Sequence, residues 1–377
     1  MMHFSKTLSS LVLTLACTLS MAENGVTEKE ILIGQFAAIS GPAKQLGLRM
    51  QLGMQTYFDS VNAQGGVNGR SIKLLTRDDG YEPDKAVSTV KALILQDKVF
   101  ALAGSVGTPT GIAALPVITA QRIPMVGMFT GAQALREPFN RYVFHVRASY
   151  FDETERIVQH LTTFGIKKIA VFYQNDSYGK AGLEGMLRAL TKRHMKSVAT
   201  ATVERNSVDV AASLETLLKA APEAIVQVSA YTSCAAFIKA ARAKGYGGQF
   251  FNVSFVGSQA LADALGDTGQ GVAISQVMPF PYVASSAIVR EYQQRMTQAG
   301  HKDFDFSSME GFVTARVLVE GLRRAGKNLT RDSLIGALES MHEVNLGGFS
   351  INYSATNHQG SNFTDLTIIG RGGKFRH

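Results

Sequence analysis

The sequence has little cysteine and proline, no tryptophan, and no long apolar run after its first residues. Among 377 residues there are two cysteines and nine prolines. Cys17 lies in a segment predicted to be removed, so Cys234 would be left alone and no intramolecular disulfide is expected. No later stretch is long and apolar enough to predict a membrane-spanning helix. Stability must therefore come from a packed core, and the apolar fraction of 45% is ordinary for a globular protein.

The N-terminal segment 1–22 has the pattern of a cleavable secretion signal. Lys6 precedes an apolar run at 11–17, and Ser20-Met21-Ala22 forms a small-x-small cleavage site. Cleavage after Ala22 would place the mature chain in the periplasm, without ATP or reduced nicotinamide, which excludes many enzyme classes. A lipid anchor on Cys17 is the alternative, but a lipobox wants leucine three residues earlier, where this chain has Thr14.

Charge and motif content exclude several other classes. The net charge of +8 is dispersed, and no basic stripe carries interleaved aromatic residues, so no nucleic-acid partner is expected. The eight histidines are scattered without a metal-binding spacing, and no GxSxG elbow occurs. Asp78 and Asp79 are adjacent at a predicted strand end, so their side chains would point to opposite faces. We therefore expect no metal, no cofactor and no catalytic residue.

Short apolar segments alternate with longer amphipathic ones along the first part of the chain. The predicted strands are 31–36, 71–77, 99–103 and 124–129. The predicted helices are one ending near Val61 before the turn at 65–69, one opened by Pro83, and one at 109–121. This alternation predicts a parallel sheet covered by helices on both faces.

The same alternation restarts near residue 142. The next predicted strands are 142–147, 168–173, 198–203, 224–228, 250–256 and 272–277, and the helices are 152–164, 177–193, 208–220 and 233–244. A crossover at 278–281 precedes helices near 288–299, 309–325 and 334–341; segments 349–353 and 366–369 are predicted to form an antiparallel pair. The predicted fold class is α/β, with two doubly wound parallel-sheet lobes and a ligand cleft beyond the carboxyl ends of the strands.

Several short motifs in a fixed order carry a resemblance to a known family. They are Ile33-Gly34 with Ser40-Gly41-Pro42, the segment 65–70, Asp78-Asp79 with Pro83, 99–104, Pro124-Met125-Val126, Ser177-Tyr178-Gly179 and Glu310-Gly311. With these, the chain resembles the periplasmic solute-binding proteins of ABC importers, in the leucine/isoleucine/valine-binding branch of the type I fold. The resemblance implies two lobes joined by a three-strand hinge. The implied division is 1–22 signal peptide, 23–143 plus 279–348 lobe 1, and 144–278 plus 349–377 lobe 2.

The turn after the third predicted strand is the first candidate ligand site. Gly104 to Thr108 leads into a helix, where free backbone N–H groups, the helix dipole and a hydroxyl would form an anion cradle. In the relatives a hydroxyl here holds the ligand carboxylate. The resemblance assigns that role to Thr108, with Ser105, Val106 and Gly107 beside it. The alternative is that Thr108 only caps the helix.

The turn after the fourth predicted strand is the second candidate. The resemblance implies that its backbone carbonyl receives the ligand ammonium and that a threonine contacts both ligand ends. An ungapped match puts Phe129 at the carbonyl position and Gly131 where that threonine stands, so Thr130 would supply the hydroxyl. The alternative is a plain turn.

Aromatic residues on the second lobe complete the expected cleft. Tyr178 and Tyr231 match cleft tyrosines of the relatives, and Tyr150 lies near a crossover. A tyrosine offers an apolar face and one polar tip, which suits covering a small ligand, although core packing is the alternative. Leu46 replaces an aromatic residue that some relatives place at the cleft mouth.

One departure from the family pattern concerns the ligand. Amino-acid binders carry an acid after the strand that ends here near Ser254-Phe255-Val256-Gly257, yet no Asp or Glu lies between Gln249 and Leu261. Burying an ammonium beside Phe255 without an anion would be costly. We therefore expect an ammonium-free carboxylate with an apolar or aromatic body, unless a distant acid such as Glu310 reaches the cleft.

The expected function is that of an extracytoplasmic receptor rather than an enzyme. It would bind a small carboxylate or an amino acid of branched-chain or aromatic type between its lobes and deliver it to an ABC permease. A ligand sensor for a membrane signalling partner is one alternative. An envelope enzyme is another, although Cys234, near a predicted helix start, has no histidine near it in sequence.

Overall fold

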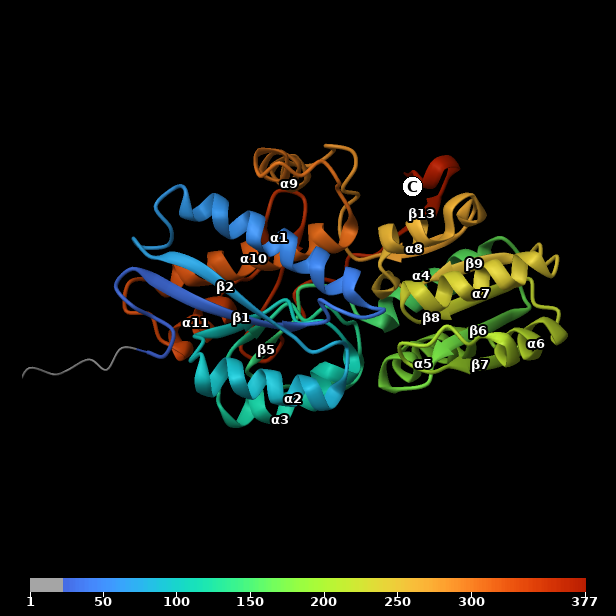
Figure 1. Cartoon of the computed structure of the whole chain (residues 1–377), viewed down its shortest axis with the longest axis horizontal. Helices are drawn as coiled ribbons and strands as arrows, with labels where there is room; N and C mark the ends of the chain where they lie inside the picture. The colour runs from blue at the N-terminus through green and yellow to red at the C-terminus, as the bar shows by residue number, and fades with distance from the viewer. Residues whose placement is uncertain (1–22) are drawn as a thin grey trace, which may run out of the picture.

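A computed structural model describes residues 23–377, so the predicted signal peptide and Cys17 lie outside the described residues. The chain folds into two α/β lobes, each built around its own sheet (Figure 1). Across residues 23–377, no helix combines the length and the apolar character needed to span a membrane.

The first lobe contains a five-stranded parallel sheet in the order β2-β1-β3-β4-β5. Its strands are β1 Glu30–Ala37, β2 Ser71–Asp78, β3 Ala101–Ala103, β4 Met125–Val126 and β5 Val143–Phe144. The helices that follow the early strands are α1 Lys44–Asn62, α2 Pro83–Lys91 and α3 Thr108–Ala120, with a π-helical turn at Ala92–Gln96 and a 3-10 helix at Gln133–Leu135. Three later helices, α9 Ala287–Gln298, α10 Phe306–Ala325 and α11 Arg331–Glu339, return to this lobe (Figure 1).

The second lobe contains a seven-stranded sheet in the order β14-β13-β10-β9-β8-β6-β7. Five strands are parallel: β6 Ile169–Gln174, β7 Ala199–Val203, β8 Ala224–Val228, β9 Gln249–Asn252 and β10 Ala273–Gln276. The remaining strands, β13 Asp365–Ile369 and β14 Phe375–Arg376, pair antiparallel. Its helices are α4 Tyr150–Thr163, α5 Ser177–Thr191, α6 Ala211–Lys219, α7 Tyr231–Ala243 and α8 Ser258–Leu265, with 3-10 helices at Ser254–Val256, Gly266–Gly269 and Arg371–Gly373.

The predicted fold class is confirmed, but the predicted C-terminal pairing is wrong. Segment 366–369 lies in β13, which pairs with β10 and β14. Segment 349–353 contributes β12 Ser350–Ile351, which forms a small hairpin with β11 Val344–Asn345. Alternating polarity identified both segments as strands but carried no information about a partner 90 residues away. The residue boundaries of the lobes stay a prediction.

Helices from opposite ends of the chain hold the first lobe together. α1 packs on α10, and two glycines make the approach possible, since a Cβ on Gly53 would meet the Ser308 carbonyl and one on Gly311 would meet that of Met50. This packing brings Glu310, in the first turns of α10, to the side of the lobe that faces its neighbour. The segments after β5, after β10 and before β13 cross between the lobes.

Candidate ligand-binding site

The predicted anion cradle lies at the carboxyl end of β3, where α3 begins. Gly107 is the N-cap and Thr108 is the first helical residue. The Thr108 side chain makes no cap hydrogen bond; its hydroxyl lies 2.5 Å from the Thr130 hydroxyl instead. The Thr108 hydroxyl thus contacts Thr130 rather than a helix N–H, and whether it contacts a ligand stays a prediction. Ser105 and Val106 are buried beside it.

The turn after β4 runs alongside this cradle. The Ser105 carbonyl accepts from the Phe129 N–H at 2.8 Å, and the Phe129 carbonyl accepts from the Gly107 N–H at 3.3 Å. One lone pair of the carbonyl expected to receive an ammonium is thus already engaged. Thr130 is fully buried and its hydroxyl donates to the Tyr150 hydroxyl at 3.3 Å.

The backbone at Gly131 leaves no room for a side chain. A Cβ on Gly131 would lie 2.6 Å from the Tyr150 nitrogen, and the Gly131 carbonyl accepts from that N–H at 2.7 Å. Tyr150 is held there because it opens α4. Ser149 caps this helix in a capping box with Asp152. Thr130, rather than residue 131, supplies the hydroxyl at this turn.

Five aromatic side chains from both lobes meet between the sheets. The Phe255 ring centroid lies 4.4 Å from that of Tyr178, 5.5 Å from Phe129 and 5.9 Å from Tyr81. Tyr150 and Tyr178 lie 5.5 Å apart. Tyr178 reaches this cluster because Asp176 caps α5 by accepting from the Tyr178 and Gly179 N–H groups. Burial raises the pKa of the Tyr81 and Tyr178 phenols well above their usual value, so both stay neutral.

A buried ion-pair network lies against this cluster. Arg147, in the segment after β5, is completely buried, and its guanidinium lies 4.9 Å from the Phe129 ring centroid. Its Nη2 lies 3.2 Å from Glu153 Oε1 on α4 and also donates to the Ser254 hydroxyl. Glu153 accepts further hydrogen bonds from the Ser254 N–H at 2.7 Å and from the Ser275 hydroxyl. This carboxylate is fully engaged within its own lobe.

Glu310 approaches the same arginine from the opposite lobe. Its Oε1 lies 3.6 Å from Arg147 Nη1, and it accepts no hydrogen bond from residues 23–377. Desolvation by burial raises the pKa of Glu310 to about 7, although Arg147 opposes the shift. The carboxyl group lines a narrow cavity with Phe129, Ser254 and Ser307. The sequence analysis left open that a distant acid such as Glu310 reaches the cleft, and the structure places Glu310 of α10 there, while the loop after β9 carries no acid.

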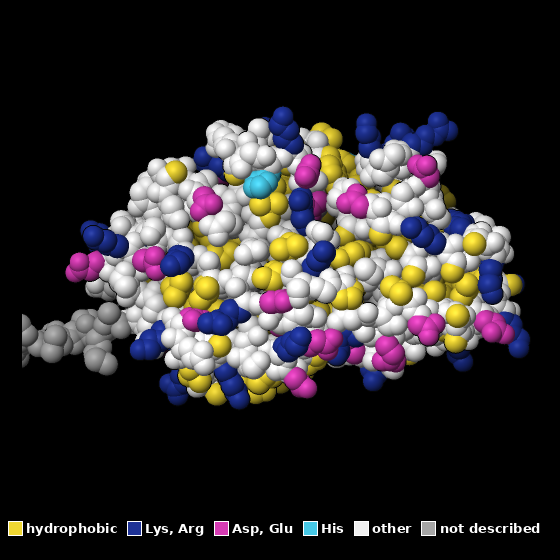
Figure 2. Space-filling view, viewed as in Figure 1, with side chains coloured by type: hydrophobic (Ala, Val, Ile, Leu, Met, Phe, Trp, Pro, Cys, Tyr) yellow, Lys and Arg dark blue, Asp and Glu magenta, His cyan; other side chains and the backbone are white. Residues whose placement is uncertain are grey.

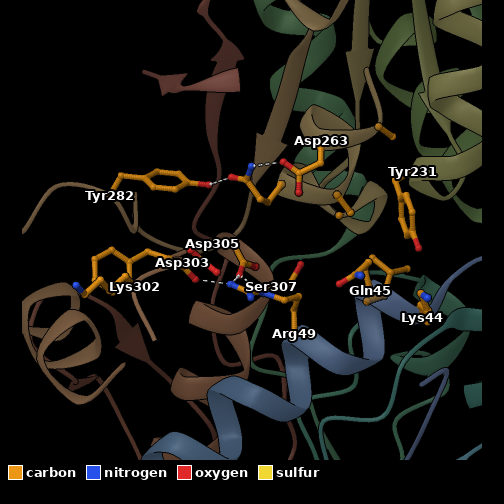
Figure 3. A pocket seen from close by; sticks show the side chains of 16 residues that line it. Lys44, Gln45, Arg49, Tyr231, Asp263, Tyr282, Lys302, Asp303, Asp305 and Ser307 are labelled. Carbon is orange, nitrogen blue, oxygen red and sulfur yellow. Dashed lines mark hydrogen bonds and ion pairs between the residues drawn. The ribbon is translucent and has the colours of Figure 1, made fainter. Parts of the chain in front are cut away.

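A much larger pocket, of about 870 Å³, opens outside this narrow cavity. Ser307 lines both. The pocket lies between α1 of one lobe and α7 and α8 of the other, and carries Lys44, Gln45 and Tyr231 on its walls (Figure 3). Arg49 pairs with Asp305 and donates to the Asp303 carbonyl, while Tyr282 donates to Gln259 at 3.0 Å.

Tyr231 and Leu46 therefore lie at the pocket opening rather than in the aromatic cluster. Both line the 870 Å³ pocket. Tyr231 opens α7 and keeps 8% of its surface exposed, whereas Tyr178 and Phe255 are fully buried. The remaining predicted residues, Ser105, Val106, Gly107, Thr108, Phe129, Thr130, Gly131, Tyr150, Tyr178 and Phe255, are brought together, but largely against one another.

The next question is whether this region holds a reactive thiol or a group of metal-binding side chains. Cys234 is buried and its thiol donates to the Ser229 carbonyl at 3.4 Å; burial raises its pKa far above the usual value, so the thiol is not activated. Within residues 23–377, no group of three His, Cys, Asp or Glu side chains is placed to hold a metal ion. On the face drawn in Figure 2, acidic and basic side chains are interspersed.

The sequence analysis missed Arg147, Glu153 and Tyr81. Arg147 gave a faint signal as the one charge in the apolar stretch 142–148. Glu153 follows a helix cap and so resembles an ordinary solvent-facing first-turn acid. Tyr81 adopts a left-handed backbone conformation, φ 63°, just after Asp78-Asp79-Gly80, and nothing local marks it as a cleft residue.

Comparison with known proteins agrees with this architecture. A family model described as periplasmic binding protein matches residues 30–373. A crystal structure from Rhodopirellula baltica, described as a possible leucine/isoleucine/valine-binding protein, is 34% identical and superposes with a TM-score of 0.88 over 93% of this chain and 96% of that chain. A substrate-binding periplasmic protein from Ralstonia solanacearum is 31% identical, with a TM-score of 0.87 over 92% of this chain and 99% of that chain.

Curated relatives are more distant. A Leu/Ile/Val-binding protein homolog from Brucella abortus is 24% identical over 226 residues, which cover 58% of this chain and 56% of that protein. An amino acid binding protein from Pseudomonas aeruginosa is 23% identical over 258 residues, 68% of each chain.

Proposed function

Because the chain belongs to the periplasmic binding protein family, we propose that it captures an apolar α-amino acid between its two lobes and delivers it to an ABC permease. The family consists of substrate-binding proteins rather than enzymes, which fits a receptor. The names of the relatives, Leu/Ile/Val-binding and amino acid binding, support the ligand class. The permease partner and cleavage after Ala22 belong to the same proposal.

The observation that carries the ligand class is the balance of buried charge. Arg147 contacts two carboxylates, Glu153 and Glu310, so these three groups together bear one negative charge when both acids are ionised. Arg136, which donates to the Arg147 carbonyl, makes no ion pair with Glu310 and lowers its pKa less than Arg147 does. Only Glu153 is stabilised in its ionised form by hydrogen bonds from neighbouring groups. A ligand ammonium beside Glu310 would supply the missing positive charge, and the hydroxyls of Thr108 and Thr130 would receive the carboxylate.

An ammonium-free carboxylate is the second candidate, favoured by the state of Arg147. Its Nε and Nη1 are buried without a hydrogen-bond partner, so they could receive an anion. Glu310, with a pKa of about 7, could then bind in its neutral form. The two candidate ligands differ in whether Glu310 is ionised or protonated in the complex.

A paired ligand screen tests both. Leucine, isoleucine, valine and phenylalanine are each compared with their deaminated analogue by thermal shift, because a ligand raises Tm by mass action. The hit is then titrated calorimetrically at pH 7 in two buffers of different ionisation enthalpy. An amino acid that ionises Glu310 releases protons on binding, whereas an ammonium-free acid binds without release or with uptake. Stabilisation by the analogues alone would contradict the amino-acid proposal.

Transport assays separate the receptor from its alternatives. Loss of the chain and loss of the cognate permease should abolish uptake of the identified ligand equally. A sensor would leave uptake intact, and an envelope enzyme would return a changed ligand.

A further inference from the structure

A second polar cavity, which shares no lining residue with the narrow cavity beside Glu310 or with the 870 Å³ pocket, lies beside two of the crossing segments. It has a volume of about 140 Å³ and is lined by residues from 135–145 and 356–359, among them Arg136, His145 and His358. Backbone hydrogen bonds tie these walls together, since the His145 N–H donates to the His358 carbonyl at 2.8 Å and the Gly360 N–H donates to the His145 carbonyl at 2.8 Å.

The Arg136 guanidinium in this wall lacks an ionic partner. The side chain is 95% buried, and no acid of residues 23–377 forms an ion pair with it. Its Nη2 donates to the carbonyls of Arg147 and Ala148 at 3.0 and 3.3 Å, while Nε and Nη1 have no partner. Burial, reinforced by the charge of Arg147, lowers the pKa of Arg136 to about 10. A buried cation without a counter-ion is costly, and an anion would relieve that cost.

Two histidines add acceptors to the same wall. His145 Nε2 lies 3.0 Å from the Leu135 carbonyl, which can only accept, so Nε2 carries the proton and the unpartnered Nδ1 is a free acceptor in the neutral ring. Burial lowers the pKa of His145 well below its usual value, which keeps the ring neutral. His358 likewise donates from Nδ1 to the Val143 carbonyl at 3.1 Å, and its Nε2 lies 3.5 Å from Glu339.

From the unpaired guanidinium, the neutral histidine acceptor and the adjoining cavity, we propose that this cavity binds a small protonated oxyanion, with Arg136 as its charge partner. A hydrogen phosphate or a bicarbonate combines negative oxygens for a guanidinium with an O–H donor for His145 Nδ1. Water could satisfy the histidine but not the charge. Two like charges oppose the anion. Glu137 lines the same cavity, and its side chain is exposed and makes no ion pair within residues 23–377. Glu339 lies 3.5 Å from His358 Nε2, but its charge is offset by an ion pair with Arg141.

Inorganic phosphate is the probe, and Glu137 provides a variant that does not threaten the fold. Tm of the whole protein is measured against phosphate concentration at pH 7.5, with ionic strength held constant by sodium chloride. Saturating phosphate should raise Tm by at least about 2 °C. Glu137→Gln removes one opposing charge and should lower the apparent Kd for phosphate by about fivefold. Glu184→Gln, an exposed acid on α5, is the matched control with the same change of net charge.

Arg136→Gln should abolish the phosphate response. If that variant does not fold, the comparison of Glu137→Gln with Glu184→Gln still decides the matter. A Tm independent of phosphate, or an equal apparent Kd for these two variants, would overturn the proposal. Neither result bears on the amino-acid site, which is assayed separately in phosphate-free buffer.

Discussion

Replacing Glu310 with glutamine should raise the free energy of unfolding of the ligand-free protein above neutral pH and lower the affinity of the protein for its ligand. In the folded chain burial raises the pKa of this carboxyl from 4.5 to about 7. The folded protein holds this proton more tightly than the unfolded chain does. The free energy of unfolding is therefore highest below the unfolded-state pKa, near 4.5, and falls as the pH rises through the folded-state pKa of about 7. At 1.36 kcal/mol per pKa unit, the ionised carboxylate costs about 3 kcal/mol at pH 8.

Urea unfolding at pH 4.5 and pH 8 measures this difference directly. Glu310→Gln and the parent should agree within about 0.5 kcal/mol at pH 4.5, where the parent carboxyl is protonated in the folded state. At pH 8 the variant should be more stable by up to about 3 kcal/mol. A gain that is equal at the two pH values, or a loss at pH 8, would refute the view that Glu310 carries an uncompensated charge.

Glu153→Gln is the matched control on the same arginine. Glu153 accepts hydrogen bonds from Ser254 and Ser275, so its removal leaves Arg147 without its main partner. That variant should be less stable than the parent at both pH values, and the larger loss, of about 3–5 kcal/mol, should come at pH 4.5, where Glu310 is protonated and leaves Arg147 without a carboxylate partner. Opposite signs for two Glu→Gln substitutions around one guanidinium would show that Glu153 stabilises the fold while Glu310 is retained for another purpose. Calorimetry should then show that Glu310→Gln binds the amino acid at least about tenfold more weakly.

Four further predictions address other parts of the chain. Thr108→Val should lower the affinity for the ligand by about 10- to 100-fold. An unchanged calorimetric affinity would mean that the Thr108 hydroxyl contacts only Thr130. Gly131→Thr should lower Tm by several degrees because the new Cβ would meet the Tyr150 nitrogen at 2.6 Å; an unchanged Tm would contradict this packing. Cys234 should react with a thiol reagent only after unfolding, so rapid labelling of the native protein would count against its burial. N-terminal sequencing of the secreted protein should begin at Glu23, and a lipidated Cys17 would replace that prediction.

The sequence predicted the parallel core well because its signals are local. A continuous apolar run such as 169–173, bounded by turns, indicates a buried strand without reference to any partner. The parallel strands of both sheets were located in this way. Pairing between distant segments is different, and β13 was wrongly assigned to β12 because two alternating segments near each other in sequence look like a hairpin.

For the site, the sequence predicted the turns but not the charges between them. Thr108, Thr130 and Tyr150 follow strands or open helices, where ligand contacts are expected, and their hydroxyls do meet. Whether they contact ligand stays a prediction. Arg147 and Glu153 belong to a hinge segment and a helix start, and only the folded chain shows that α10 brings Glu310 against them. A charged residue in a sequence is ordinarily expected to face solvent. The burial of Arg147 could therefore not be predicted without knowing that Glu153 and Glu310 lie beside it.

In each lobe, one segment of the chain packs against a segment that lies much later in the sequence, and this affects how the protein folds. α1 packs on α10 more than 240 residues away, and β10 closes against β13 some 90 residues later. A chain delivered N-terminus first cannot pack the first lobe until α10, which ends at Ala325, has emerged, and cannot complete the second sheet until β13, which ends at Ile369, has emerged. Long-range closure of this kind slows folding and leaves apolar sheet edges uncovered in the interval. Until β13 has paired with β10, and β14 with β13, this edge of the second sheet has no partner strand.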